Sequence, residues 1–160
     1  MGGECTSAMG DQIILPEELS DSTKRLYTHA RVANGTLYMS GQVGWEGSDA
    51  DAETEIDESD RPGVKIREGD GEVPDTEIRA QTRQAFRNVE VILDEVDKEL
   101  SDIRKVTSYF TNIDRDFGGY KTVWGELFDE PYPAHTALGI QSLAAEELLL
   151  EIEAEVPLDE

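Results

Sequence analysis

Two segments near the C-terminus constrain the fold most, because each has the residue pattern of a β-strand. Across residues 150–156, apolar residues alternate with three glutamates, so an extended chain presents one apolar face and one acidic face. The earlier segment, residues 131–140, places His135 and Ala137 on one of its faces. If the two strands pair, the imidazole of His135 and the carboxylate of Glu151 face the same space.

The rest of the pattern predicts further strands and two helices. The dipeptide Asn34-Gly35 between two extended segments predicts a β-hairpin, because both residues tolerate the positive φ angles of a type I′ turn. Two later segments have apolar residues at helical spacing, with Asp75 as the N-cap candidate of the first and Gly118 and Gly119 weakening the first turn of the second. The predicted elements are strands at 30–33 and 36–41, a helix that begins at Asp75 and is ended by Ser101 and Asp102, a strand at 103–112, a helix at 117–128 and strands at 131–140 and 150–156.

Five short motifs follow one another along the chain. They are Ser40-Gly41-Gln42, QTRQA at 81–85 with Asn88, Val106-Thr107 before Thr111-Asn112, YPAHT at 132–136 and LEIEA at 150–154. These motifs resemble those of the Rid family, also called YjgF or L-PSP, over roughly residues 27–156. The resemblance implies an α+β, chorismate-mutase-like fold in the order β-β-α-β-α-β-β, with two helices on one face of the sheet. It also implies a homotrimer that covers the other face, and hydrolysis of reactive enamines or imines.

The resemblance further implies a ligand cleft between neighbouring subunits. In the family, an Arg binds the substrate carboxylate, backbone groups of the same strand hold a water molecule, and a Glu positions or activates that water. Carried over to this chain, the Glu is Glu151 and the position of the Arg is held by His135, and these are the candidate catalytic residues. The candidate ligand-binding residues are Tyr27, Ser40, Lys121 in place of an Asn, and Ala137 in place of a frequent Cys.

His135 is where the chain departs from the family pattern. Arg presents a permanent, planar fork to a carboxylate, whereas imidazole is mostly neutral at pH 7 and offers one such contact at most. Losing a charge-assisted hydrogen bond of about 1.5–3 kcal/mol weakens the binding of a 2-imino acid, although Lys121 could restore a positive charge. Two functions remain open: an enamine or imine hydrolase with weak or altered activity, and a non-catalytic small-molecule-binding or regulatory trimer.

Each candidate residue also has a structural interpretation. His135 can be a strand histidine hydrogen-bonded to a neighbour, Glu151 a solvated charge, and Tyr27 a packing residue. His29, His135 and Glu151 have donor atoms that suit zinc, but their spacing does not require a metal. Neither a metal nor another cofactor is therefore predicted.

The chain is strongly acidic, with 36 acidic and 14 basic residues and a net charge of −22. Self-repulsion destabilises such a chain in dilute buffer, and molar salt, where the Debye length is about 3 Å, screens it. Because the excess is spread along the chain, the composition predicts a halophilic protein rather than an acidic mesophilic one. The same charge repels phosphate backbones and anionic lipids, so neither nucleic acid nor a membrane is an expected partner.

We expect one domain with two additions. Residues 1–24 are predicted to be an N-terminal extension with a short packed patch, and residues 25–160 a single domain with an acidic surface loop inserted at about 47–75. The single cysteine, Cys5, excludes an internal disulfide. Because neither a signal peptide nor a membrane span is recognisable, a cytoplasmic location is expected.

Overall fold

The computed structural model describes residues 11–19, 21–44 and 75–158. Cys5, the segment predicted to be an acidic insertion (up to residue 74) and the side chain of Asp75 lie outside the described part. The strands are β1 (Gln12–Ile14), β2 (Ala30–Ala33), β3 (Thr36–Met39), β4 (Lys105–Phe110), β5 (Ala134–Gly139) and β6 (Leu150–Pro157). The helices are α2 (Asp75–Asp94) and α3 (Ile113–Leu127), with short 3-10 helices at Ser22–Arg25 and Leu100–Asp102. The predicted end of the first helix at Ser101 and Asp102 is wrong, because these residues belong to a separate 3-10 helix.

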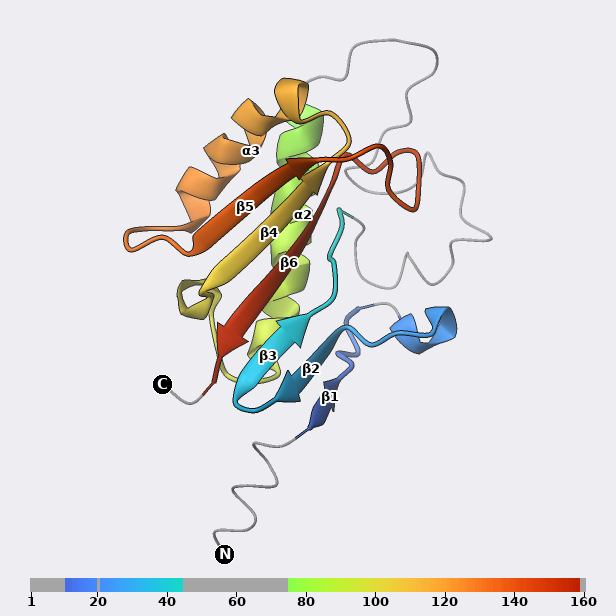
Figure 1. Ribbon diagram of the computed structural model, residues 1–160, viewed down its shortest axis with the longest axis vertical. Helices are drawn as coiled ribbons and strands as arrows, with labels where there is room; N and C mark the ends of the chain where they lie inside the picture. Colours follow the sequence, from blue (N-terminus) through green and yellow to red (C-terminus); the bar gives the residue numbers. More distant parts are fainter. Residues whose placement is uncertain (1–10, 20, 45–74, 159–160) are drawn as a thin grey trace, which may run out of the picture.

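The six strands form one mixed sheet in the order β1-β2-β3-β6-β4-β5. Neighbouring strands are antiparallel except β4 and β5, which are parallel. Helices α2 and α3 pack against each other and lie on one side of the sheet, which we call the helix face (Figure 1). No helix of the described residues covers the other side, the open face. The predicted α+β arrangement, with two helices on one face, is confirmed.

The sheet order corrects one expectation. Strands β5 and β6 do not pair, because β4 lies between them and pairs with both. Two parallel strands need a crossover connection, and α3 supplies it between β4 and β5. Strand β5 therefore lies beside β4, at the edge of the sheet.

The β2–β3 hairpin forms as predicted. Asn34 and Gly35 connect the strands with φ angles of 52° and 73°, and Ala33 pairs with Thr36. Positive φ at both positions gives the backbone the twist that antiparallel strands need. The hairpin then delivers the Ser-Gly-Gln motif to the end of β3.

The apolar faces of the strands and helices meet in one core. On β6, Leu150, Ile152 and Val156 are completely buried, as their alternation predicts, and Phe86 of α2 belongs to the same cluster. Burying an apolar side chain of this size contributes about 1.5–3 kcal/mol. The core therefore determines that the glutamates of β6 point to the open face.

Helix α3 begins earlier than predicted. Asn112 is its N-cap, and the side-chain oxygen of Asn112 accepts a hydrogen bond from the Arg115 amide at 3.1 Å. The predicted start at residue 117 is wrong because this cap allows the helix to begin at Ile113. Gly118 consequently lies in the second turn of the helix rather than in the first.

The N-terminal extension contributes an edge strand that we did not predict. Strand β1 pairs with β2 in an antiparallel register, and Ile14 is buried. A strand of three residues is too short for an alternating pattern to be recognised.

Candidate functional site

The candidate residues of β5 and β6 lie on opposite faces of the sheet. Val106 of β4 is in register with both His135 and Ala154, and residues directly opposite in a sheet point to the same face. Because Val106 and Ala154 belong to the core, His135 lies on the helix face. Tyr109 of β4 is in register with Glu151 and points to the open face. The expectation that His135 and Glu151 face the same space is therefore wrong for a single chain.

Glu151 is half-buried beside a backbone segment that approaches it closely. A Cβ atom at Gly41 would overlap the carboxylate of Glu151, so this glycine leaves the space that the carboxylate fills. Burial raises the pKa of Glu151, and the negative charge of Glu153 raises it further. A carboxyl group with a raised pKa is suited to accept a proton as a general base.

The Ser-Gly-Gln motif connects the hairpin to β6 next to Glu151. The Gln42 amide donates a hydrogen bond to the Ile152 carbonyl at 2.7 Å, and the Gln42 carbonyl accepts one from the Ile152 amide at 2.9 Å. The Ser40 hydroxyl donates to the Thr28 carbonyl at 2.6 Å. Ser40 therefore fixes the backbone that lies against Glu151.

Tyr27 lies close to the same motif. Its ring contacts the His29 ring edge-on, with the centroids 6.1 Å apart, and Nδ1 of His29 lies 3.3 Å from Nε2 of Gln42. Tyr27 is 40% exposed, whereas His29 is 5% exposed, so the tyrosine ring lies at the surface. We call Tyr27, Ser40 and Glu151 the Glu151 group.

His135 belongs to a compact polar cluster on the helix face. Its Nε2 atom lies 3.1 Å from the Ser108 hydroxyl and 3.0 Å from the Tyr120 hydroxyl, and the two hydroxyl oxygens are 2.6 Å apart. Ser108 and Tyr120 are buried, while His135 is half-buried. The cluster joins β4, α3 and β5, as expected of a strand histidine that is hydrogen-bonded to its neighbours.

Aromatic rings enclose the imidazole. The Tyr120 ring stacks on it with a centroid distance of 5.6 Å, and the Trp124 ring lies at 4.6 Å. Burial lowers the pKa of His135, and the positive charge of Lys105 lowers it further. Burial also raises the pKa of Tyr120. Both directions favour the uncharged forms at neutral pH.

The other two candidates lie on the same side of the sheet as His135. Ala137 is in register with the buried Ser108 and so faces the helices. Lys121 is exposed on α3, and its Nζ atom lies 5.8 Å from the centroid of the Phe117 ring. We call His135, Ala137 and Lys121 the His135 group.

Three residues near the candidates were missed by the sequence analysis. Ser108 interrupts the apolar face of a predicted strand, and a polar residue in that position was the available signal for a buried hydrogen bond. Tyr120 was indistinguishable from a core aromatic residue. Tyr109 lies on the open face, where burial and the negative charge of Glu153 raise the pKa of Tyr109. No local pattern marks Tyr109.

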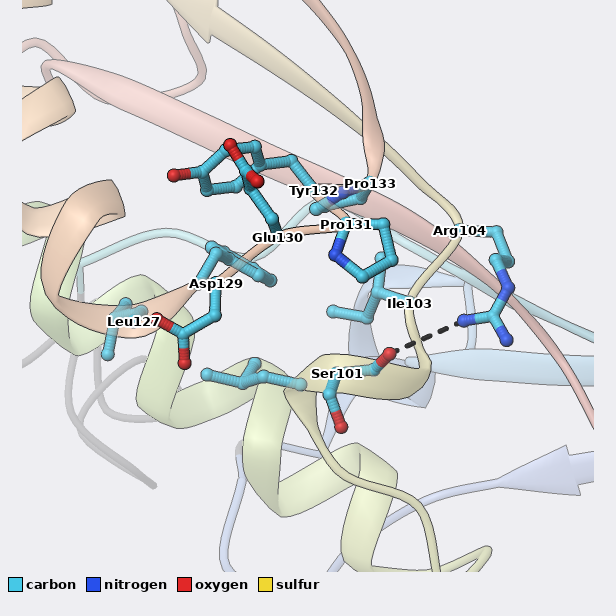
Figure 2. Close-up of a pocket in the computed structure, with 11 residues that line it drawn as sticks. Ser101, Ile103, Arg104, Leu127, Asp129, Glu130, Pro131, Tyr132 and Pro133 are labelled. Carbon is cyan, nitrogen blue, oxygen red and sulfur yellow. Dashed lines mark hydrogen bonds between the residues drawn. The ribbon is translucent and has the colours of Figure 1, made fainter.

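A separate cavity of about 460 Å³ opens near the start of β5. Figure 2 shows its walls, which are residues 127–133 on one side and Leu100, Ser101, Ile103 and Arg104 on the other. The Arg104 guanidinium donates to the carbonyls of Ser101 and Asp102 at 3.3 and 3.0 Å. None of the candidate residues lines this cavity.

Among residues 11–19, 21–44 and 75–158, no three His, Cys, Asp or Glu side chains come together as metal ligands. None of the helices described there is long and apolar enough to cross a membrane.

Comparisons with known proteins identify relatives of the chain. The family model described as endoribonuclease L-PSP matches residues 20–157. The chain is 28% identical to a proposed regulator, AldR, of Lactococcus lactis, over 79% of this chain and 82% of that protein. It is 26% identical to a 2-iminobutanoate/2-iminopropanoate deaminase of Dermatophagoides farinae, over 73% of this chain and 74% of that protein.

Solved structures also resemble the fold of this chain. The protein YjgH superimposes with a TM-score of 0.70 and 25% identity, over 94% of this chain and 98% of that one. The span matched by the family model contains every element from β2 to β6 and both groups of candidate residues. The chain therefore belongs to the L-PSP family, the Rid or YjgF family that its motifs resemble.

Proposed function

We propose that this protein is a homotrimer that binds a small metabolite in a cleft between subunits and hydrolyses a reactive enamine or imine to the keto compound and ammonia. Family membership supports deaminase-type chemistry or small-molecule binding in general. The finer proposal rests on one observation, the separation of the Glu151 group from the His135 group by the sheet. Each chain holds two half-sites, and a second chain is needed to complete either one.

The two half-sites lie where subunits can meet. Strand β5 is the last strand of the sheet, so the His135 group lies beside a sheet edge. On the open face, Tyr38 and Leu138 are 48% and 41% exposed, and cover by a neighbouring subunit would bury them. In the proposed trimer, Glu151 of one subunit therefore faces the β5 edge of the next.

The chemistry needs a water molecule at the C=N carbon and a group that takes its proton. Glu151 is placed to accept this proton while the new C–O bond forms, because its raised pKa favours proton uptake. The nitrogen gains protons, the C–N bond breaks, and the carbon becomes a carbonyl carbon. One water molecule is consumed and one ammonia is released.

The remaining candidates shape the cleft. The Ser40 hydroxyl holds the loop that lies against Glu151. The exposed ring of Tyr27 offers an apolar wall with a polar tip. From the adjacent subunit, the small Ala137 leaves room for a ligand, and the exposed Lys121 supplies a cation at the rim.

Subunit complementation tests this arrangement. Glu151→Gln removes the proposed base, and Ala137→Phe fills the other half-site, so each variant alone is expected to be inactive. When equal amounts of the two variants are refolded together, about a quarter of the wild-type activity should return, because a quarter of the subunit contacts join two intact half-sites. Glu155→Gln, an exposed glutamate of the same strand face, is the control for the loss of charge.

Light scattering checks that the variants and the mixture have the mass of a trimer. Capture of an untagged variant with a tagged one shows that subunits have exchanged. An exchanged mixture that stays inactive would contradict a site shared between subunits. A monomer with full activity would contradict it as well.

A second candidate is a non-catalytic small-molecule-binding or regulatory trimer, which the likeness to AldR favours. Imines generated in situ separate the two functions. Ammonia release above the buffer rate that disappears in Glu151→Gln supports the enzyme. If no ammonia is released in either dilute or molar-salt buffer, and a ligand raises the melting temperature, the result supports the binding protein.

A further inference from the structure

The polar cluster around His135 bears on the class of substrate, an inference that rests on the proposed function. We infer that Ser108 and Tyr120 hold His135 as a neutral imidazole with a bare, that is unprotonated, Nε2 atom. The site therefore takes imines and enamines that lack a carboxylate group.

Counting hydrogens in the cluster selects the tautomer. Nε2 and the two hydroxyl oxygens lie within 2.6–3.1 Å of one another, so three short contacts join three atoms. With Nε2 bare, one hydroxyl donates to Nε2 and the other donates to its hydroxyl neighbour, so both hydroxyl hydrogens are bonded. With a proton on Nε2, the nitrogen can no longer accept, so only two of the three hydrogens find an acceptor within the triangle and one hydroxyl hydrogen is left without one. Ser108 and Tyr120 are 0% and 1% exposed, so water cannot relieve this conflict.

The charges around the His135 ring also favour the neutral imidazole. Lys105 of β4 is the charged residue whose field reaches His135, and this field opposes protonation. From α3, the ring faces the uncharged Tyr120 phenol and the Trp124 indole, and Lys121 is exposed over the Phe117 ring instead. Burial and the neighbouring cation therefore both favour the neutral imidazole.

A neutral imidazole whose Nε2 points inward is not a charged partner for a carboxylate, and the rim cation, Lys121, lies over the Phe117 ring. The opposing half-site carries Glu151 and Glu153, which repel an anion. The Lys105 ammonium donates to the Thr136 hydroxyl at 2.6 Å, and Lys105 is in register with Glu155, which balances its charge. An uncharged imine, or its protonated iminium form, suits this field better than a 2-imino acid. Such imines derive from amines rather than from amino acids.

The tautomer can be measured without any activity. In long-range ¹H–¹⁵N spectra of the full chain between pH 6 and pH 8, Nε2 of His135 should resonate as a bare nitrogen and Nδ1 as a protonated one. His135→Gln identifies the signals, because His29 is the only other histidine. The double variant Ser108→Ala/Tyr120→Phe should increase the proton affinity of His135 about tenfold. A proton on Nε2 at pH 7, or an imidazolium at pH 6, in the wild-type protein would overturn the inference.

The substrate class is tested with two imines that differ only in a carboxylate, 2-iminopropanoate and 2-iminopropane, each generated in situ. We expect kcat/KM to be at least about tenfold higher for the uncharged imine, because the neutral imidazole gives the carboxylate no charge-assisted contact and Glu151 and Glu153 repel it. In Ser108→Ala/Tyr120→Phe this ratio should fall several-fold at pH 6, because an imidazolium can then bind the carboxylate. Tyr132→Phe makes the same phenol-to-phenyl change outside the site and should leave the ratio unchanged.

A tenfold preference of the wild-type protein for 2-iminopropanoate would overturn the inference while leaving the proposed hydrolase intact. If neither imine is hydrolysed, the hydrolase fails, and the inference is decided by calorimetric binding of 2-oxobutanoate and 2-butanone. Tighter binding of 2-oxobutanoate then contradicts it, and tighter binding of 2-butanone supports it.

Discussion

Glu151 occupies a position where burial and a neighbouring charge both oppose its ionised form. The folded chain therefore binds a proton at this residue more tightly than the unfolded chain does. The stability linked to Glu151 is fully present at low pH and is lost as the pH rises through its raised pKa. A carboxyl group kept where its ionisation opposes folding is typical of residues that serve proton transfer rather than stability.

The substitution Glu151→Gln should therefore separate stability from activity. We expect a higher free energy of unfolding at pH 7–8, because Gln avoids the buried charge, and no gain near pH 4, where the carboxyl is protonated. If Glu151 is the general base, kcat should fall about 10²- to 10⁴-fold in the same variant. Urea unfolding at the two pH values and an ammonia-release assay provide the measurements, with the exposed Glu155→Gln as control. A loss of stability at pH 8 would contradict this account.

His135 has the opposite linkage. Because burial lowers the pKa of His135, the unfolded chain binds the proton more tightly. The stability linked to His135 is present above the ordinary histidine pKa of about 6.5 and is lost as the pH falls toward the lowered value. Part of the acid sensitivity of the protein should therefore come from one ring.

We expect the free energy of unfolding to fall less steeply between pH 7 and pH 5 in His135→Leu than in the wild type. Leu removes the titrating ring, but it also leaves the Ser108 and Tyr120 hydroxyls without their nitrogen acceptor, so it should lower stability at pH 7 by about 1–3 kcal/mol. Denaturant unfolding at the two pH values measures both effects. Identical slopes for the two proteins would show that His135 does not titrate in this range.

At the scale of elements, two glycines should respond in opposite ways to the same change. A Cβ atom at Gly41 would overlap the Glu151 carboxylate, so Gly41→Ala must displace that side chain and lower both stability and activity. Gly118 lies in α3 with open space around it, so Gly118→Ala should stabilise the helix by about 0.5–1 kcal/mol. Thermal unfolding of both variants checks the contrast. A neutral Gly41→Ala would show that Glu151 moves freely.

A helix or strand was predictable where the residue pattern within its own segment specifies the conformation. The alternation in β6, the Asn34-Gly35 turn and the apolar spacing in α2 each specify a conformation within one segment. Helix α3 was placed too late because the predicted start rested on apolar spacing, whereas Asn112 and its cap bond decide where the helix begins. Strand β1 was missed because three residues contain no measurable period.

The neighbours of a strand were not predictable from that strand alone. His135 and Glu151 each lie on a face that their own segment predicts, but their relative position depends on β4 entering between β5 and β6. The family motifs identified the candidate residues without stating which of them one chain brings together. Ser108 and Tyr120 were invisible as partners because they are far apart in sequence from His135 and meet it only through the sheet register and the packing of α3.

On the scale of the whole molecule, the net charge of −22 should control folding and assembly together. In the proposed trimer, three open faces bring three sets of Glu151, Glu153 and Glu155 toward one another, so repulsion within the chain is joined by repulsion between chains. Salt screens both, because the Debye length falls from about 10 Å at 0.1 M to about 3 Å at 1 M.

We therefore expect the melting temperature to rise by more than about 5 °C between 0.1 and 2 M KCl, which corresponds to about 1.3–2.5 kcal/mol or more for a chain of this size. The trimer mass measured by light scattering should fall toward the monomer mass in dilute buffer. The triple variant Glu151→Gln/Glu153→Gln/Glu155→Gln should form trimers at a lower salt concentration than the wild type does. Its melting temperature should still rise with KCl, because the other acidic residues remain. The variant therefore separates repulsion between chains from repulsion within a chain. A melting temperature that stays constant across this range would contradict the halophilic interpretation, because unscreened repulsion of this size must weaken a compact chain.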